Sequence, residues 1–399
     1  MLVQFMLKNV LSFKKETILD MTAINAYKEH QCNVIDYETK EKYLRVAAIY
    51  GANASGKSNI YMAMTYFQRI IAESLNNVED GEETAIQTYY QPFSFDSEKE
   101  NSEFQIVNIL GNFEYKYGFE YNSNCIVTEW LYRKNLQTKR YSTVFERTTE
   151  KVEFGSCVRK ECEVYKEQIP VETLVLTFFN KLKLKSNIFK IVYSGVMDTL
   201  VVPTNFCEDT RLLEALLPRL IDEEKSALVD FLSAIDTGIK DIDYDDSEKE
   251  VKFTTYHRGK DGELHPLNLF FESEGTIKSI MLFIYARTAI LYHKSIFVDE
   301  LNIKLHPLLL KFIIDLFYEN ESQAQLIYTT HDTTLLDKKF FRRDQILFVQ
   351  KDEFGYSELS ALSDFKVRSD ASFERDYLAG VYGGIPWLKE FSMVVSSSL

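Results

Sequence analysis

Apolar residues follow three patterns along the chain, and each pattern predicts a different kind of element. Continuous apolar runs at residues 45–50, 295–298 and 326–328 predict buried strands. Between residues 93 and 154, short runs of alternating apolar and polar residues predict an antiparallel meander. From about residue 160 to 236, apolar residues recur at spacings of three and four, which predicts helices. Together these patterns predict an α/β fold.

The first apolar strand leads directly into a glycine-rich loop. Residues 51–58 read Gly-Ala-Asn-Ala-Ser-Gly-Lys-Ser, and residues 59–64 continue as the first turns of a helix. Backbone N–H groups of such a loop and the helix N-terminus can surround a polyphosphate. Lys57 would reach the β and γ phosphates, and the Ser58 hydroxyl would join the coordination shell of Mg²⁺. The residues predicted to bind ATP or GTP here are Gly51, Asn53, Ala54, Ser55, Gly56, Lys57, Ser58 and Asn59.

A second strand ends in two acids. The apolar residues 295–298 are followed by Asp299 and Glu300. A carboxylate at the tip of a strand beside the phosphate loop can hold the hydration shell of Mg²⁺, and the next acid can orient and deprotonate the attacking water. We assign Asp299 to the metal and Glu300 to the water. The alternative is an ordinary strand exit, which is common for such a sequence.

A third apolar strand ends in a histidine. His331 follows residues 326–330, about thirty residues after the acidic pair. A neutral imidazole there can hydrogen-bond the γ-phosphate or the attacking water and so report whether the terminal phosphate is present. A lone histidine is more often a surface or core residue, but its place on a strand of the same type favours the functional interpretation. The residues assigned to catalysis are Glu300, His331 and Lys57.

A fourth segment opens a strongly apolar helix. Residues 273–276 read Ser-Glu-Gly-Thr, and residues 277–287 predict the helix. Free N–H groups at a helix start form an anion site, to which the Ser273 hydroxyl adds a donor. The alternative is a helix N-cap without a ligand.

The order of these four motifs resembles the ABC-type ATPase heads of the chromosome-maintenance and RecF class. Residues 5–13 also look like the opening strand of those heads. The resemblance implies that two heads sandwich two nucleotides, and that Ser273 and Gly275 touch the γ-phosphate bound to the other head. It also implies that Glu300 is the catalytic acid and His331 the switch histidine.

A narrower resemblance spans most of the chain. Residues 300–307, 329–333 and 341–346 look like the stand-alone bacterial AAA-type ATP/GTPase family of abortive-infection and anti-phage loci. The other similar segments are residues 91–93, 129–132, 145–147 and 378–386. This resemblance implies a role in anti-phage defence. The segment after His331 is too short for an appended nuclease domain, so we expect a separate effector protein such as a nuclease, with nucleic acid as a further candidate ligand.

Two features depart from the broader class. The signature is Ser-Glu-Gly-Thr rather than a double-glycine form, so contact with the opposite γ-phosphate is expected to be weaker. The sequence shows no long heptad region and no Cys-x-x-Cys at a hairpin tip. We therefore expect no long arms of the kind that chromosome-maintenance proteins use to reach around DNA.

The motifs and patterns together predict an ABC-type P-loop ATPase head with a mixed nucleotide-binding core. Residues 1–90 are expected to hold the first part of the core, and residues 91–158 the antiparallel β-lobe. Residues 159–240 are expected to form a helical lobe or partner-binding insertion. Residues 241–399 are expected to complete the core with the signature, the acidic strand end and the histidine.

Composition and charge restrict the class of protein further. A chain of 399 residues with 45% hydrophobic and 14% aromatic content has room for two or three lobes and an ample core. A net charge of −14 argues against indiscriminate nucleic-acid binding by the whole surface, although a local basic groove remains compatible with it. No leader and no membrane-spanning apolar run is visible, so we expect a cytoplasmic protein without membrane contact. Five scattered cysteines are expected to be free thiols: Cys32, Cys125, Cys157, Cys162 and Cys207.

Two charged stretches predict exposed surface rather than a site. Lys181, Lys183, Lys185 and Lys190 could meet phosphate or an acidic partner, but a solvated helix face is the more ordinary interpretation. In the acidic residues 241–248, alternation with Ile and Tyr favours an exposed strand edge over a metal site.

The leading hypothesis is an ATPase whose two copies close on ATP and open after hydrolysis, so that the nucleotide controls a partner. The first alternative is a RecF-like DNA repair or recombination ATPase that acts directly on DNA. The second is a nucleotide-dependent structural scaffold with slow or absent turnover, against which the presence of Glu300 argues.

Overall fold

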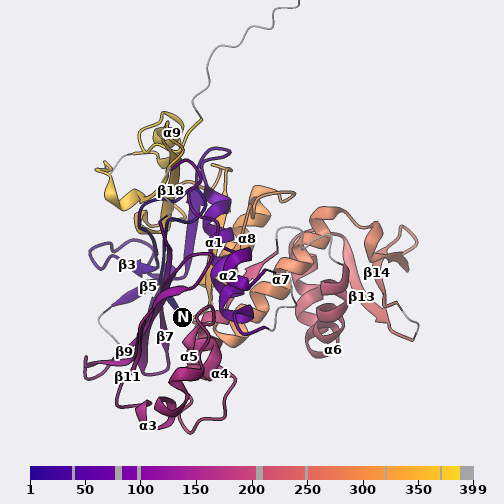
Figure 1. Cartoon of the computed structure of the whole chain (residues 1–399). Coiled ribbons are helices and arrows are strands. Elements are labelled where there is room, and N and C mark those ends of the chain that lie inside the picture. The colour runs from indigo at the N-terminus through magenta and orange to yellow at the C-terminus, as the bar shows by residue number, and fades with distance from the viewer. Residues whose placement is uncertain are drawn as a thin grey trace, which may run out of the picture.

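Two large sheets form the body of the molecule (Figure 1). In the computed structural model, a six-stranded core sheet packs through a helix against a seven-stranded antiparallel sheet. The predicted α/β fold, with a mixed core sheet, an antiparallel sheet and helices, is confirmed. The structure describes residues 1–37, 41–76, 83–96, 100–203, 210–247, 250–319, 321–368 and 371–386.

The core sheet is parallel except at one edge, where its last two strands pair antiparallel. Helices cover both of its faces, which explains why its inner strands are apolar throughout. Val298 pairs with Tyr328, and Thr330 pairs with Tyr50, so the neighbouring strands end at the same edge of the sheet. In spatial order the strands are β12 (Thr199–Val202), β16 (Ser295–Val298), β17 (Gln325–Thr330), β6 (Val46–Tyr50), β18 (Ile346–Lys351) and β19 (Ser357–Ala361).

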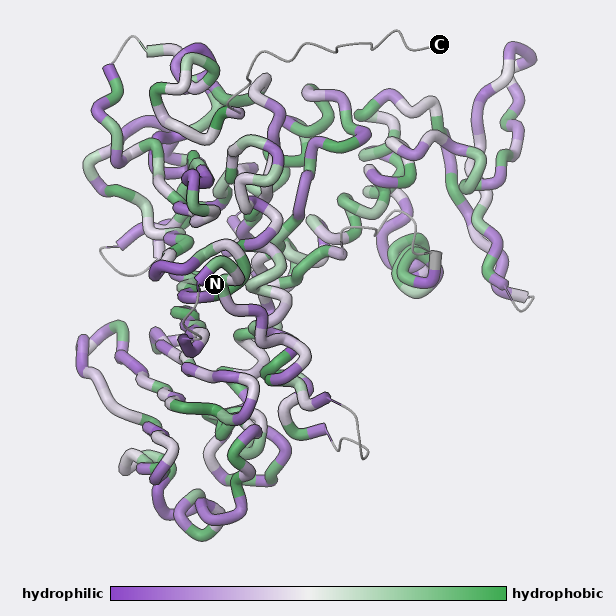
Figure 2. Tube along the Cα trace, turned by 45° about the horizontal axis from the view of Figure 1, so that its top comes forward, coloured by the Kyte–Doolittle hydropathy of each residue, from purple (hydrophilic) through white to green (hydrophobic). Residues whose placement is uncertain are grey.

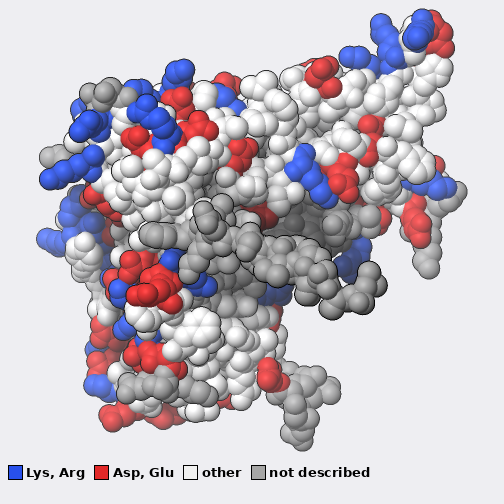
Figure 3. Space-filling view, turned by 90° about the horizontal axis from the view of Figure 1, so that it is seen from above, with Lys and Arg blue, Asp and Glu red and all other residues white. Residues whose placement is uncertain are grey.

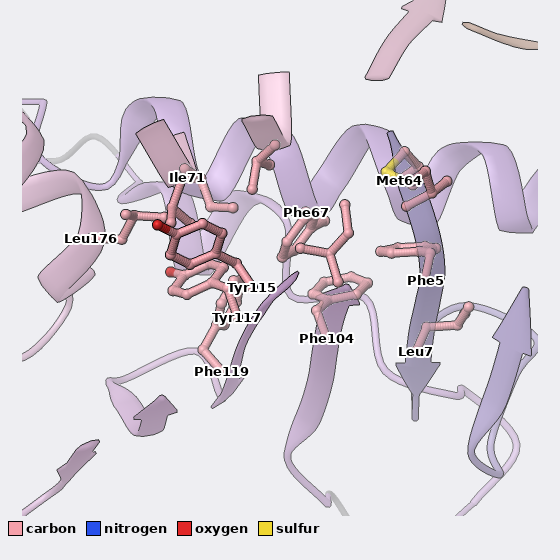
Figure 4. Packing of buried hydrophobic residues seen from close by; sticks show 14 of the residues in the cluster. Phe5, Leu7, Met64, Phe67, Ile71, Phe104, Tyr115, Tyr117, Phe119 and Leu176 are labelled. Carbon is pink, nitrogen blue, oxygen red and sulfur yellow. The ribbon is translucent and has the colours of Figure 1, made fainter. Parts of the chain in front are cut away.

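The helix between the two sheets is α1 (Lys57–Glu73). Its Phe67 ring lies 5.6 Å from the rings of Phe5 and Phe104 and 5.7 Å from that of Phe119. Figure 4 shows these rings gathered between the helix and the strands. Each fully buried ring contributes about 1.5–3 kcal/mol, so this cluster fixes α1 on the antiparallel sheet. The strands of that sheet, in spatial order, are β11 (Val152–Phe154), β10 (Tyr141–Thr148), β9 (Ile126–Asn135), β8 (Phe113–Tyr121), β7 (Ser102–Leu110), β1 (Leu2–Lys8) and β2 (Thr17–Asp20).

The other face of the core sheet is covered by α7 (Glu274–Tyr292) and α8 (Pro307–Tyr318). Beyond them lies α6 (Thr210–Ala234), which breaks at Glu224, where φ is −144°. The carboxylate of Glu224 accepts a hydrogen bond from Arg287 of α7 at 2.5 Å. A three-stranded sheet stands outside α6 and projects from one side of the molecule (Figure 2). Its strands are β13 (Ile239–Asp245), β14 (Lys252–Arg258) and β15 (Leu264–Asn268).

Shorter elements connect these layers. The small sheet contains β3 (Thr22–Ala23), β5 (Lys42–Leu44) and β4 (Val34–Asp36). The short α-helices are α2 (Ala85–Thr88), α3 (Arg159–Cys162), α4 (Val175–Asn180), α5 (Ile188–Met197) and α9 (Phe373–Leu378). Single 3-10 turns span Gln31–Asn33, Glu163–Gln168, Leu269–Phe271, Arg343–Gln345 and Leu362–Asp364.

A buried carboxylate ties the antiparallel sheet to α4. The Glu129 side chain accepts hydrogen bonds from the backbone N–H groups of Val175 and Leu176 at 2.7 and 3.1 Å, and from the Tyr117 hydroxyl at 3.0 Å. Its partner across the strands is Arg147, 3.8 Å away. Burial raises the pKa of Glu129, which these partners counteract. The family-like segments at residues 129–132 and 145–147 therefore contribute to packing rather than to the nucleotide site.

The predicted opening strand over residues 5–13 is too long at its C-terminal end. The strand ends at Lys8, because Asn9 and Leu11 adopt left-handed backbone conformations with φ of 52° and 53°. Asn9 is buried, and its amide donates to the carbonyl of Glu100 at 2.7 Å. The chain therefore turns at residues 9–13, and the turn lies beside the phosphate loop.

Each of the two large sheets takes strands from more than one of the predicted segments. The antiparallel sheet takes β1 and β2 from the segment 1–90, and the core sheet takes β12 from the segment 159–240. The remaining described part of 159–240 is mainly helical, from α3 to α6. Sheet pairing thus joins the N-terminal segment to the segments 91–158 and 241–399, and it joins the segment 159–240 to the segment 241–399.

The charged stretches lie at the surface. The four lysines between residues 181 and 190 are exposed, and the acidic stretch forms β13 at an edge of the three-stranded sheet, with Glu248 outside the described residues. Figure 3 shows basic and acidic side chains interspersed over one face of the molecule. Of the cysteines, Cys207 lies outside the described residues and the other four are free thiols. Within the described ranges, no helix is long and apolar enough to cross a membrane.

Candidate nucleotide-binding site

The phosphate loop lies at the C-terminal end of β6 and leads into α1. Ligands of parallel α/β sheets bind at this edge, where the strands end and the helices begin. Ala54 and Gly56 adopt positive φ values of 62° and 111°, which turn the loop back toward the helix. Gly56 is the N-cap of α1, so the first free N–H groups of the helix face the loop.

Both glycines of the loop are required by close contacts. A Cβ atom on Gly51 would lie 2.5 Å from the carbonyl oxygen of Val349, and one on Gly56 would lie 2.4 Å from the Ser357 hydroxyl. The positive φ of Gly56 adds strain for any side chain. The loop conformation therefore depends on glycine at both positions.

The Lys57 ammonium lies across the loop. Its Nζ donates to the carbonyl oxygens of Gly51 and Ala52 at 2.8 and 2.9 Å. Burial lowers the pKa of Lys57, and the nearby Glu300 and Asp299 carboxylates partly restore it. An ammonium has three donors, so one remains for a phosphate oxygen.

Hydroxyl groups from two distant segments meet on one carboxylate oxygen. Ser58 Oγ donates to Asp299 Oδ1 at 3.2 Å, and Thr329 Oγ1 donates to the same atom at 2.5 Å. A serine hydroxyl beside a carboxylate is a donor set that suits Mg²⁺. Among the described residues, no three His, Cys, Asp or Glu side chains form a group that could hold a metal ion. The pair Ser58 and Asp299 fits the usual arrangement for Mg²⁺, in which phosphates and water supply the other ligands.

Glu300 and His331 follow neighbouring strands of the core sheet. Glu300 has a left-handed backbone with φ of 48°, and its N–H donates to Thr329 Oγ1 at 2.7 Å. The exposed His331 has its Nε2 atom 3.5 Å from the Asn302 side-chain nitrogen. The Asn302 amide oxygen in turn accepts from Thr330 Oγ1 at 2.8 Å. The structure thus holds the histidine next to the loop that follows Glu300.

Ser273 and Gly275 begin α7 and pack against that same loop. Ser273 Oγ accepts from the Thr276 N–H at 3.1 Å and lies 2.8 Å from the Thr276 hydroxyl, which is an N-cap arrangement. A Cβ atom on Gly275 would lie 2.9 Å from the carbonyl oxygen of Lys304. The Lys304 ammonium pairs with Glu274 at 2.9 Å. The signature segment and the loop after Glu300 therefore form one surface.

Comparison with known families agrees with this geometry. The family described as "AAA domain, putative AbiEii toxin, Type IV TA system" matches residues 46–161 and 182–337, which include the phosphate loop, the signature segment, both acids and the histidine. The chain belongs to this AAA domain family. The abortive-infection AAA-type resemblance of the sequence is confirmed. No curated protein matches the sequence.

Solved structures of SMC head domains are also similar to this chain. The SMC head bound to the C-winged helix domain of ScpA is 14% identical, with a TM-score of 0.44 over 94% of this chain and 99% of that one. The SMC head of Thermotoga maritima is 12% identical, with a TM-score of 0.44 over 92% and 99% of the two chains. An SMC head bound to a ScpA domain, derived from Pyrococcus furiosus, is 13% identical, with a TM-score of 0.40 over 95% and 98%.

Two serines that support the phosphate loop were not predicted from the sequence. Ser357 Oγ donates to the Ser55 carbonyl oxygen at 2.6 Å and lies 2.7 Å from Ser12 Oγ, from which it can accept. Asn59 Nδ2 donates to Ser12 Oγ at 2.7 Å. Ser357 lies 302 positions from Ser55, so no local pattern marks it. Ser12 lies in the predicted opening strand, where its role depends on the turn at residues 9–13.

Lys278 links the signature helix to the loop that carries Glu300 in this AAA-family chain. Its buried Nζ donates to the carbonyl oxygens of Ile303 at 2.7 Å and Glu300 at 3.4 Å. Hydrogen bonds from a charged donor contribute about 1.5–3 kcal/mol. In the sequence, Lys278 is only one residue of the predicted helix over residues 277–287.

Lys278→Met should therefore lower ATP turnover by about tenfold, since about 1.4 kcal/mol corresponds to a factor of ten, while the Kd for ATP stays close to that of the wild type. Steady-state phosphate release and equilibrium ATP binding measure the two effects separately. The control is Lys166→Met, because Lys166 pairs with Glu163 at 3.0 Å on the surface and such pairs contribute little. Equal losses in binding and turnover would contradict a positioning role for Lys278.

Proposed function

We propose that this chain is an ATP-hydrolysing head that binds ATP and Mg²⁺ at the phosphate loop, closes against a second copy, and thereby controls a separate effector. The observation that carries the proposal is the convergence of Ser58 and Thr329 on Asp299 Oδ1. Ser58 and Asp299 are separated by 241 positions, yet they meet beside Lys57 at the edge where phosphate-binding sites form.

The side chains divide the chemistry of hydrolysis between them. Lys57 would bind the β and γ phosphates, and a bound triphosphate would favour its charged form. Ser58 and Asp299 would hold Mg²⁺, which supplies positive charge to the β and γ oxygens. Glu300 would accept the proton of the attacking water, and His331 would contact that water or the γ-phosphate. The left-handed backbone of Glu300 fixes where its side chain begins.

The surface around the signature supports closure of two copies. Phe271, two residues before Ser273, is 79% exposed, and Leu308 at the start of α8 is 73% exposed. These residues flank the contact between Gly275 and Lys304. Large exposed apolar side chains beside polar groups are typical of protein interfaces. If a second copy docked here, Ser273 and Gly275 of the first copy would approach the γ-phosphate bound to the second copy.

The proposed role in anti-phage defence rests on the family description, which names an abortive-infection toxin. The described structure accounts for an ATPase head but assigns no group to cutting nucleic acid, so the killing step is proposed to belong to a separate effector protein. The nucleotide state of the pair would then decide whether that effector is engaged.

The experiment that tests this function measures phosphate release from ATP and Mg²⁺ over a wide range of protein concentrations. If two copies form the active site, the specific activity should rise with protein concentration and then level off. Lys57→Met should remove the activity at every concentration, because the phosphates lose their cationic partner. A specific activity that is constant with concentration, or activity that persists in Lys57→Met, would contradict the proposal.

A further inference from the structure

An exposed aromatic cluster lies beside the phosphate loop, on the side away from Asp299. We define the aromatic cluster as Phe93, Phe95, Phe354 and Tyr356. In the core sheet, β18 and β19 lie on one side of β6, and β17 and β16 lie on the other. The proposed Mg²⁺ ligand Asp299 follows β16, on one side of the phosphate loop. The connection between β18 and β19 therefore lies on the other side of that loop.

Two segments that are distant in sequence build the aromatic cluster. The rings of Phe93 and Tyr356 stack at 4.5 Å and 18°, and Phe95 stands perpendicular to Phe93 at 5.5 Å. Gly355 has φ of 89°, and a Cβ atom there would lie 2.7 Å from the Phe95 ring. The Phe95 ring therefore packs directly against the backbone of Gly355 in the turn between β18 and β19. A side chain at position 355 would displace it.

The outer rings of the aromatic cluster face solvent. Phe95 is 74% exposed and Phe354 is 66% exposed, whereas Phe93, which contacts the Phe95 ring, is 5% exposed. Phe354 lies in the turn between β18 and β19, and Phe95 contacts that turn at Gly355. Burying an aromatic side chain is favourable, so two large exposed rings at this turn indicate a contact with a ligand or another molecule.

The aromatic cluster is joined directly to the phosphate loop. Ser357, adjacent to Tyr356, donates to the Ser55 carbonyl oxygen at 2.6 Å and touches the position that a Cβ of Gly56 would take. Neighbouring Cα atoms are about 3.8 Å apart. Tyr356 of the aromatic cluster is thus one residue from Ser357, whose side chain contacts the phosphate loop. A nucleotide with its phosphates in that loop could reach the cluster.

We propose that the aromatic cluster is the platform on which the base of the bound nucleotide stacks, with Phe95 supplying the open ring face. This inference rests on the proposed function, since it requires the triphosphate to sit in the phosphate loop. The flat faces of bases and aromatic rings attract each other without reading the hydrogen-bonding edges of the base. The nearby lysines are already paired: Lys14 with Asp96 and Glu100, and Lys15 with Glu358. The platform therefore favours the larger purines over pyrimidines and distinguishes ATP from GTP only weakly.

The test compares ATP with inorganic tripolyphosphate, which carries the phosphates without a base. Both are titrated with Mg²⁺ into the wild-type protein, Phe95→Ala and Phe95→Trp by calorimetry. Phe95→Ala should raise the Kd for ATP by about tenfold and leave the Kd for tripolyphosphate unchanged, because one base stack contributes about 1–3 kcal/mol. Phe95→Trp should keep or strengthen ATP binding. The matched control is Tyr141→Ala, since Tyr141 is 70% exposed on the antiparallel sheet.

Each outcome separates this inference from the proposed function. Equal affinities for ATP in the wild type and Phe95→Ala would overturn the stacking platform while leaving nucleotide binding intact. Equal losses for ATP and tripolyphosphate would also overturn it, because damage to the loop would then explain the effect. If the wild type bound neither ligand, the proposed function would fail, and this inference with it.

Discussion

Glu300→Gln should lower the rate of ATP hydrolysis by about two to four orders of magnitude while ATP still binds. The amide keeps the size of the side chain but cannot accept the proton of the attacking water. The groups proposed to bind the triphosphate and Mg²⁺ are Lys57, Ser58 and Asp299, and this change leaves all three in place. Single-turnover phosphate release measures the rate, and equilibrium titration measures the binding.

The matched control for this variant is Glu263→Gln. Glu263 is exposed in the connection between β14 and β15, far along the chain from the strand ends that carry the site. The control protein should hydrolyse ATP at the wild-type rate. Wild-type turnover in Glu300→Gln would exclude Glu300 from the chemical step.

The largest expected loss of stability comes from Arg342→Ala. The Arg342 side chain is 2% exposed and pairs with Asp344 at 2.7 and 2.9 Å. Its guanidinium also donates to the carbonyl oxygens of Ile24, Tyr27 and Glu29 at 3.0–3.2 Å. Removing it leaves the buried Asp344 carboxylate without its cationic partner and three carbonyls without this donor, which should lower the free energy of unfolding by about 3–5 kcal/mol.

The adjacent Arg343 offers a close control for that prediction. Arg343 is 33% exposed, its nearest contact with Glu29 is 3.7 Å, and its guanidinium lies 4.3 Å from the Tyr27 ring. Arg343→Ala should cost about 1 kcal/mol or less. Urea unfolding of the three proteins measures both values. A similar loss in the two variants would show that the buried pair contributes no more than a surface contact.

The sequence predicted those parts of the site that local patterns define. The strand over residues 45–50, the glycine loop and the following helix are adjacent in sequence, so each restricts the others. The positions of the acids after β16 and of the histidine after β17 could also be predicted, because parallel strands end at one edge of the sheet. Ser273 was correctly placed at a helix start, although the structure gives its hydroxyl a partner within the helix.

The parts that were missed depend on contacts between distant segments. Thr329 bonds Asp299 across neighbouring strands, and Lys278 reaches two carbonyls beyond the next strand. Neither residue type indicates such a contact by itself. The opening strand was drawn too long because left-handed backbone at Leu11 is uncommon for a branched apolar residue and has no sequence signal. The family-like residues at 341–346 proved to include a buried ion pair that anchors the N-terminal segment.

Light scattering coupled to size exclusion tests directly whether two copies close around ATP. The Glu300→Gln protein is measured with and without ATP and Mg²⁺, alone and combined with Ser273→Arg. We expect a mass increase that requires ATP and is abolished by the Ser273 change, because an arginine there would obstruct the contact with the second copy. A mass that does not depend on nucleotide would contradict closure driven by ATP.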